Sequence, residues 1–251
     1  MFMWLDLLRN ARSSRTLVIL FIVGLSCVMA MAQEASPVEV VAAGGEEVPE
    51  RESRGRFMWG PTVGVDIFAM ENSFGPMRRH NSMGFGVAAG AMMRYLYDNR
   101  WFIDAGLNFA YDYAPVKVAV FNQESDNPDF EEYDADRCAL QLPVYLGYRL
   151  KLVDRFYFNP FTGVMLSYGL AGRMDAPKGM PEYNLYGQSG VWRRFSASWA
   201  IGWNFDIGDS VGVGFAAFFG ANRMARRKIF ETSTMNEVSC RVYFTYWFGV
   251  K

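Results

Sequence analysis

The chain has 251 residues, a formal net charge of −1 and 51% apolar residues, among them 21 Phe, 13 Tyr and 7 Trp. A disordered chain would be poor in aromatic residues, so the composition excludes that class. The near-zero charge also excludes a typical nucleic-acid-binding domain, which would carry a strong basic excess. The length fits a single all-β domain.

Residues 1–32 predict a cleavable signal peptide. Three arginines precede the apolar run "TLVILFIVGLSCVMA", and Ala30-Met31-Ala32 closes the segment. This order of basic, apolar and small residues is typical of exported proteins. Cleavage before Gln33 would remove three Arg and one Asp and change the formal charge from −1 to −3. Lipid attachment at Cys27 is the less favoured alternative, because Leu25-Ser26 does not have the usual spacing.

Residues 33–56 contain many Glu, Gly and Pro but no aromatic residue, and therefore predict a flexible periplasmic tail. From residue 57 to residue 251 the pattern changes to strands and turns. Each predicted strand has at least the roughly 9 to 11 residues that cross a bilayer at a tilt. The eight strands are Phe57–Met70, Met83–Tyr97, Trp101–Tyr113, Arg137–Lys151, Arg155–Leu170, Val191–Phe205, Ser210–Asn222 and Glu237–Val250.

Short and long connections alternate between these strands. Three are tight, at 98–100, 152–154 and 206–209, and four are long, at 71–82, 114–136, 171–190 and 223–236. This alternation is typical of outer-membrane barrels with periplasmic turns and extracellular loops. No apolar run after the signal approaches the roughly 20 residues of a membrane helix, so only a closed barrel could span the bilayer. We therefore predict an all-β protein, an eight-stranded antiparallel up-and-down transmembrane β-barrel, located in the outer membrane with a periplasmic N-terminus.

The hairpin at residues 89–111 predicts which face is the lumen. Its odd positions are apolar or aromatic, whereas its even positions carry small or polar residues. If Tyr97 pairs with Trp101 across the turn, Arg94 lies opposite Asp104, and the two would form a structural ion pair inside a narrow barrel. Further predicted lumen residues are Asp66, Asp112, Arg149, Arg194 and Arg241.

The outward face carries two other predicted features. Cys138 and Cys240 lie on separate strands, too far apart for a disulfide, and are expected to be free thiols that face lipid. An aromatic girdle is expected at the periplasmic strand ends. Its predicted members are Trp59, Tyr97, Trp101, Phe156, Phe158, Trp203, Phe205, Tyr246 and Phe248.

The segment "LQLPVYLGYRLKLVDRFYFNPFTGVMLSYGL" resembles the PorT-like outer-membrane β-barrel family. Leu142-Pro143-Val144 is the hydrophobic-Pro-hydrophobic triplet, Tyr148 follows it, and Gly163 lies on the strand after the tight turn. The resemblance covers residues 57–251 and implies an eight-stranded outer-membrane barrel that is accessory to secretion or envelope organisation. Many barrels end on an aromatic residue, whereas here three residues follow Phe248.

Two segments invite a chemical interpretation. His80, the single histidine, forms with Ser82 a His-x-Ser pair like that of outer-membrane lipid A deacylases, but the following strand offers no nearby carboxylate to orient the imidazole. The acidic stretch 122–136 lacks the spacing and the turn glycine of a calcium-binding loop. We expect both segments to be solvated loops, with no catalytic residue, no metal site and no cofactor.

The basic residues of the first and last long loops should become neighbours when strand eight closes on strand one. Arginine side chains can bind phosphate through paired hydrogen bonds, so these loops could hold lipopolysaccharide. Surface charge without a dedicated ligand is the alternative. The residues are Arg78, Arg79, Arg223, Arg226, Arg227 and Lys228.

These observations favour a non-enzymatic, monomeric outer-membrane barrel whose extracellular loops contact lipopolysaccharide or a partner protein of the envelope or of a secretion system. A small passive porin is the main alternative. A lipid A-modifying enzyme and a soluble barrel of the lipocalin type are weaker ones.

Overall fold

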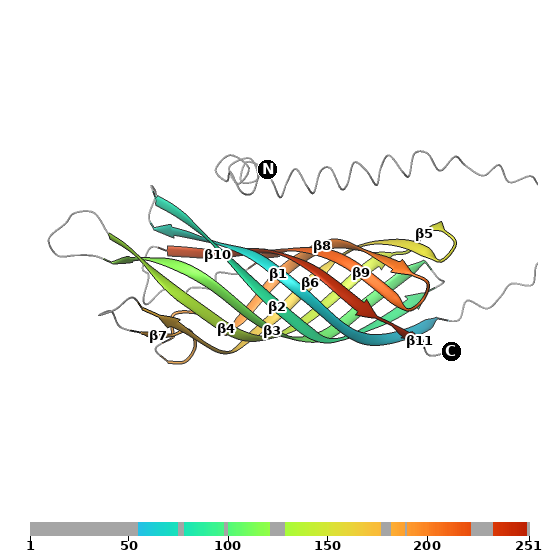
Figure 1. Cartoon of the computed structure of the whole chain (residues 1–251), viewed down its shortest axis with the longest axis horizontal. Helices are drawn as coiled ribbons and strands as arrows, with labels where there is room; N and C mark the ends of the chain where they lie inside the picture. The colour runs from blue at the N-terminus through green and yellow to red at the C-terminus, as the bar shows by residue number, and fades with distance from the viewer. Residues whose placement is uncertain are drawn as a thin grey trace, which may run out of the picture. The chain divides into compact units, whose positions relative to one another are not determined.

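The computed structural model describes residues 55–74, 78–97, 100–120, 129–176, 182–188, 190–221 and 233–249. Within them no helix combines the length and the apolarity needed to cross a membrane. Antiparallel strands instead form a sheet that closes on itself (Figure 1). The strands are β1 (Arg56–Phe74), β2 (Arg78–Tyr97), β3 (Trp101–Val120), β4 (Asp129–Tyr148), β5 (Leu150–Val153), β6 (Phe156–Asp175), β7 (Tyr183–Asn184), β8 (Phe195–Ile207), β9 (Val211–Gly220), β10 (Ser233–Tyr246) and β11 (Phe248–Gly249).

Within the described ranges these segments make a barrel of eight strands. β4 and β5 are one strand interrupted at Arg149, and β10 and β11 are one strand interrupted at Trp247. β1 pairs with β2 on one side and with β10 and β11 on the other, which closes the sheet. β7 pairs only with β6, near one end of the barrel. The predicted fold class, a closed eight-stranded antiparallel barrel, is confirmed.

Several strands are longer than predicted. The expected loop at 71–82 consists largely of the ends of β1 and β2, so Arg78, Arg79 and His80 lie on a strand and not in a loop. The expected loop at 114–136 contains the ends of β3 and β4. One strand starts later than predicted. β8 begins at Phe195 and not at Val191, because Val191 and Trp192 pack inside the barrel.

Side chains alternate between the two faces along the middle of most strands. Outward positions are mostly apolar and exposed, as at Val63, Leu107 and Val242, whereas inward positions include buried Asp66, Asn108 and Arg241. This sorting is what a transmembrane barrel requires, because hydrocarbon surrounds it and only its interior can satisfy polar groups. Cys138 and Cys240 share the outward face as free, half-buried thiols.

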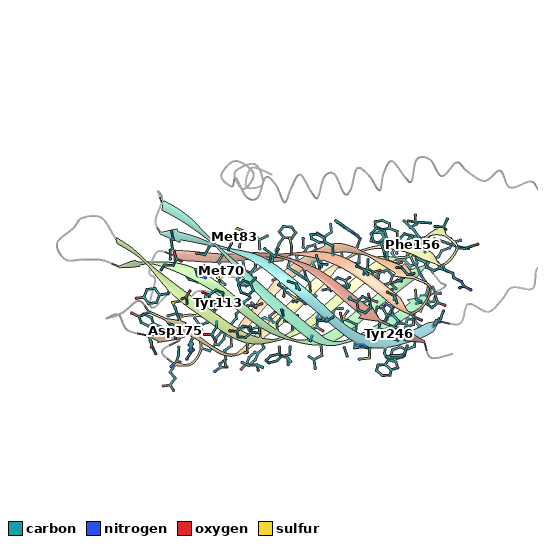
Figure 2. All side chains as sticks on the ribbon, in the orientation of Figure 1. Met70, Met83, Tyr113, Phe156, Asp175 and Tyr246 are labelled. Carbon is teal, nitrogen blue, oxygen red and sulfur yellow. The ribbon has the colours of Figure 1, made fainter. Side chains whose placement is uncertain are left out.

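The alternation reverses polarity at the end of the barrel that carries β7, here called the β7 end; the opposite end is the β5 end. Figure 2 shows Tyr113 and Asp175 toward the β7 end and Phe156 and Tyr246 toward the β5 end. Beyond Tyr113 the inward face becomes an apolar core. The outward face becomes charged, with Lys117, Glu132, Asp134, Asp136, Arg173 and Asp175.

Candidate functional site

The lumen is the part of the molecule where polar side chains gather, and its β5 end is filled by an ion-pair layer around Arg94. Arg94 is completely buried. Its Nε and Nη2 donate to the two carboxylate oxygens of Asp104 at 2.7 and 2.8 Å, and its Nη1 donates to Asp206 at 2.7 Å. The guanidinium also lies 4.4 Å from the ring of Phe102 and 4.5 Å from that of Trp247. The aromatic rings and the carboxylates together offset the free-energy cost of burying the Arg94 charge.

The same layer reaches the turn between β8 and β9. Asn159 Nδ2 donates to Asp206 at 2.7 Å, and Arg149 Nη2 donates to Asp209 at 3.2 Å. Arg56 donates to the other oxygen of Asp209 at 2.9 Å. Burial raises the pKa of Asp209, but the hydrogen bonds from Arg56 and Arg149 outweigh it, so the pKa lies below its ordinary value. Asp209 thus ties the turn to the strand ends around it.

Two further clusters occupy the lumen toward the β7 end. Arg241 donates to both oxygens of Asp66, at 2.7 and 2.6 Å, and to Gln141 at 2.6 Å. Arg137 donates to Asp112 at 2.8 Å and through two nitrogens to Glu237 at 2.9 and 2.6 Å. Paired contacts of this kind are the strongest that guanidinium groups make with carboxylates.

An apolar cluster closes the β7 end above these charges. The segment after β7 folds inward, held by hydrogen bonds from Leu185 N to Gly172 O at 3.0 Å and from Trp192 N to Leu185 O at 2.8 Å. Its side chains pack against the inward faces of β1, β3, β4 and β6. The buried members are Phe68, Met70, Ala114, Val116, Tyr133, Ala135, Met174, Leu185, Val191 and Trp192.

Little space remains between these layers. One cavity of about 10 Å³ lies between the Arg137 and Arg241 clusters, and another of about 20 Å³ lies beside Tyr145 and Tyr243. A cavity needs roughly 10 to 15 Å³ to hold one water molecule. Each of these two cavities can therefore hold about one water molecule and is too small for a larger solute.

The structure places most predicted lumen residues in these networks. Arg94 faces Asp104, and Asp66, Asp112, Arg149 and Arg241 are buried inside as well. Arg194 is the exception: it is half-buried and donates to the carbonyls of Gly169 and Leu170. It compensates the irregular pairing of β4 with β6 there. The side chains of Arg78, Arg79, His80, Arg223, Arg226, Arg227 and Lys228 lie outside what the structure describes.

Sequence reasoning missed three members of the networks. Asp206 falls in the predicted tight turn at 206–209, although it continues the inward alternation of Gly202 and Asn204 on β8. Glu237 is the first residue of a predicted strand. Trp247 lies where β10 is interrupted, and only the packing against Arg94 reveals its role.

No group of three or more His, Cys, Asp or Glu side chains in the described part of the chain is placed to hold a metal ion. The described residues of the acidic stretch have other contacts: Glu132 Oε2 lies 3.9 Å from Lys117, and Asp134 accepts from Tyr113 at 2.5 Å. Ser82 points into the barrel and is buried.

An apolar outer band, a charged lumen and a closed antiparallel sheet define the class of integral β-barrel membrane proteins. A family model described as "Outer membrane protein beta-barrel domain" matches residues 31–224. The chain belongs to this family and is an outer-membrane protein. No curated protein matches the sequence.

Solved structures that resemble the chain are outer-membrane proteins of low sequence identity. The attachment invasion locus protein Ail of Yersinia pestis is 9% identical, with 76% of this chain and 98% of that chain covered and a TM-score of 0.38. Neisserial surface protein A is 12% identical, with 74% and 96% covered and a TM-score of 0.40. OprG from Pseudomonas aeruginosa is 10% identical, with 78% and 97% covered and a TM-score of 0.40.

Proposed function

We propose that this protein is a non-conducting, non-enzymatic barrel of the PorT-like type that presents an extracellular extension to lipopolysaccharide or to a partner protein of the envelope or of a secretion system. The observation that carries the proposal is the reversal of polarity at the β7 end. A strand of 20 residues, such as β3, is about twice as long as a bilayer crossing needs. The surplus has a charged exterior and an apolar core, as a water-soluble domain does.

The β7 end is the extracellular end in this proposal, and the N-terminal side of β1 is periplasmic. Exposed aromatic residues such as Trp59, Trp101 and Phe248 near the β5 end fit a periplasmic girdle. The three predicted tight turns at 98–100, 152–154 and 206–209 also lie at this end, and short periplasmic turns are usual in such barrels.

Thiol labelling of intact cells tests the orientation. In a chain whose Cys138 and Cys240 are replaced by Ser, we introduce Glu132→Cys at the β7 end or Asp154→Cys at the β5 end. A membrane-impermeant maleimide should label only the first variant. Labelling of the second alone would reverse the proposed orientation.

Lipopolysaccharide is the first ligand to test, because Arg78 and Arg79 lie on β2 at the proposed outer end. Phe74 pairs with both Arg78 and Ser233, so the start of β10 lies near the start of β2. Charge reversal of Arg78 and Arg79, together with Arg226 and Arg227, should weaken binding to immobilised lipopolysaccharide roughly tenfold, which corresponds to about 1.4 kcal/mol.

The control is charge reversal of Arg100 and Arg155, which are exposed near the β5 end. It should leave lipopolysaccharide binding unchanged. Because the control changes half as many charges, a loss of binding free energy about half as large would mean that net charge alone drives the binding, and unchanged binding in both variants would favour a protein partner.

A further inference from the structure

Arg193 is an exposed cation that directly precedes β8 on the outer wall of the barrel. The ladder between β6 and β8 ends at the pair Tyr168 and Phe195. Two residues further along this register, Arg193 falls beside Leu170. Side chains alternate between the two faces of a strand, so Arg193 shares the outward face with exposed Phe195. Its charge is therefore presented on the lipid-facing side.

The backbone on both sides of Arg193 is held in place. Trp192 is buried in the apolar cluster of the β7 end. Arg194 O accepts from Gly169 N at 2.7 Å, and the Arg194 side chain donates to the carbonyls of Gly169 and Leu170 at 2.9 and 3.0 Å. These contacts fix the point at which the Arg193 side chain leaves the wall, so its charge has a defined height on the barrel.

This height is the outer boundary of the apolar band. Leu170 and Phe195, which lie beside Arg193, are exposed and apolar. Further along β6 the outward positions carry charged Arg173 and Asp175, and Figure 2 shows Asp175 toward the β7 end. Lipid headgroups lie where an apolar band of this kind ends. The Arg193 side chain can therefore reach the headgroup phosphates while its stem packs on apolar neighbours.

Arg193 also differs from the neighbouring outward cation in its electrostatic surroundings. Arg173 lies 3.4 Å from Asp136 and 3.3 Å from Asp175. Within the described ranges, no acidic side chain pairs with Arg193. Guanidinium groups bind phosphate through paired hydrogen bonds. An uncompensated guanidinium beside exposed apolar side chains therefore fits a ligand in which a phosphate is joined to hydrocarbon chains.

We propose that Arg193 binds a phosphate group of lipid A, the membrane anchor of lipopolysaccharide, and that Leu170 and Phe195 contact its acyl chains. The inference rests on the proposed function, which places the β7 end in the leaflet that contains lipopolysaccharide. The site lies on β6 and the start of β8, whereas Arg78 and Arg79 lie on β2. The barrel wall would thus bind lipopolysaccharide independently of those residues.

Lipid binding to the purified whole protein in detergent, measured by native mass spectrometry, tests the site. Arg193→Gln should weaken binding of diphosphorylated lipid A roughly fivefold, the usual contribution of one cation near an anionic lipid surface. Binding of dephosphorylated lipid A should not change. Arg193→Lys keeps the charge and should retain most of the affinity. The control is Arg100→Gln, exposed near the β5 end, which should bind both lipids as the native protein does.

Two results with lipid A would overturn the inference once heat-modifiable gel migration shows that the variants are folded. One is an equal loss for the phosphorylated and the dephosphorylated form, and the other is no loss for the phosphorylated form. Phosphatidylglycerol is the third probe. An equal or larger loss for this lipid would assign the site to phospholipids and would also overturn the inference.

The charge-reversal variant of Arg78, Arg79, Arg226 and Arg227 is measured in parallel. A loss in that variant alone would overturn the Arg193 site and leave the proposed function intact. A loss in Arg193→Gln alone would support the site and contradict lipopolysaccharide binding by the loops.

Discussion

Arg94 illustrates how a single residue determines what the lumen can be. Its guanidinium contacts three carboxylate oxygens and two aromatic rings without exposure to water. Such a group cannot simply lose one partner, because the remaining charge stays buried and cannot be hydrated. The residue therefore stabilises the barrel only as part of its complete set of neighbours.

Asp104→Ala should lower the free energy of unfolding by about 3 to 5 kcal/mol, because it removes two of the three carboxylate oxygens around buried Arg94. Urea titration in lipid vesicles measures the change. The control is Asp154→Ala, since the Asp154 carboxylate is 93% exposed in its pair with Lys151. A loss in the control equal to that of Asp104→Ala would contradict the role given to burial.

Asp209 should make stability depend on pH. Because its pKa in the folded barrel lies below the ordinary 3.8, its contribution is complete above that value and is lost as the pH falls through the folded pKa. Asp209→Asn should therefore reduce the melting temperature at pH 7 slightly, since surface pairs contribute roughly 0 to 1 kcal/mol. The difference in melting temperature between this variant and the native protein should shrink below pH 3.8. The melting temperature can be read from gels, because folded and heat-unfolded barrels migrate differently. A constant difference at all pH values would refute this linkage.

Pro115 lies where β2 and β3 separate. The β2–β3 ladder stops at the pair Phe85 and Tyr113, while the β3–β4 ladder continues to Val120 and Asp129. Two residues further, Met83 would face Pro115, which has no N–H to donate. Among the described residues, the edge of β3 that faces β2 is therefore unpaired beyond Tyr113. Exposed Lys117 makes this edge unsuitable for pairing with another chain.

Pro115→Val should extend the β2–β3 ladder by one pair. The new N–H of residue 115 should donate to the Met83 carbonyl, and this bond should hold the Met83 N–H against the carbonyl of residue 115. The Met83 amide should then exchange with solvent roughly fivefold more slowly, because one added hydrogen bond contributes about 1 kcal/mol. Hydrogen exchange measured by mass spectrometry would detect the change. Phe85 is the internal control, since it is paired in both proteins. Unchanged exchange at Met83 would mean that another feature separates the strands.

The sequence predicted the barrel because lipid and lumen impose a period of two over whole strands, as in residues 89–111. The tight turn at 98–100 was enough to place Arg94 opposite Asp104. The outer strand ends could not be recognised, because apolar Val116 and charged Lys117 exchange the usual sides there. Trp192 and Trp247 depend on contacts between distant segments, which periodicity does not encode.

At the scale of the whole molecule, the barrel has two barriers in series. The Arg94 layer fills the β5 end, and the apolar cluster around Trp192 closes the β7 end. Neither barrier depends on the other, because they are built from different strand segments. A passive porin would need both to be absent.

The native protein should therefore give no single-channel steps in planar bilayers. Deletion of residues 182–192 should also leave the barrel non-conducting, because the Arg94 layer remains in place. Conductance recordings at high salt test both statements. Steps from the native protein would instead support the porin alternative, and steps from the deletion variant alone would locate the barrier at the β7 end.

The charged exterior of the β7 end has a consequence for biogenesis. In the proposed orientation, Glu132, Asp134 and Arg173 must travel from the periplasm to the cell surface while the strands insert. Hydrocarbon would oppose that transfer by several kcal/mol for each charge. Spontaneous insertion into pure lipid should consequently be slow, and a hydrated passage supplied by assembly factors would be needed to deliver these hairpin tips across the bilayer.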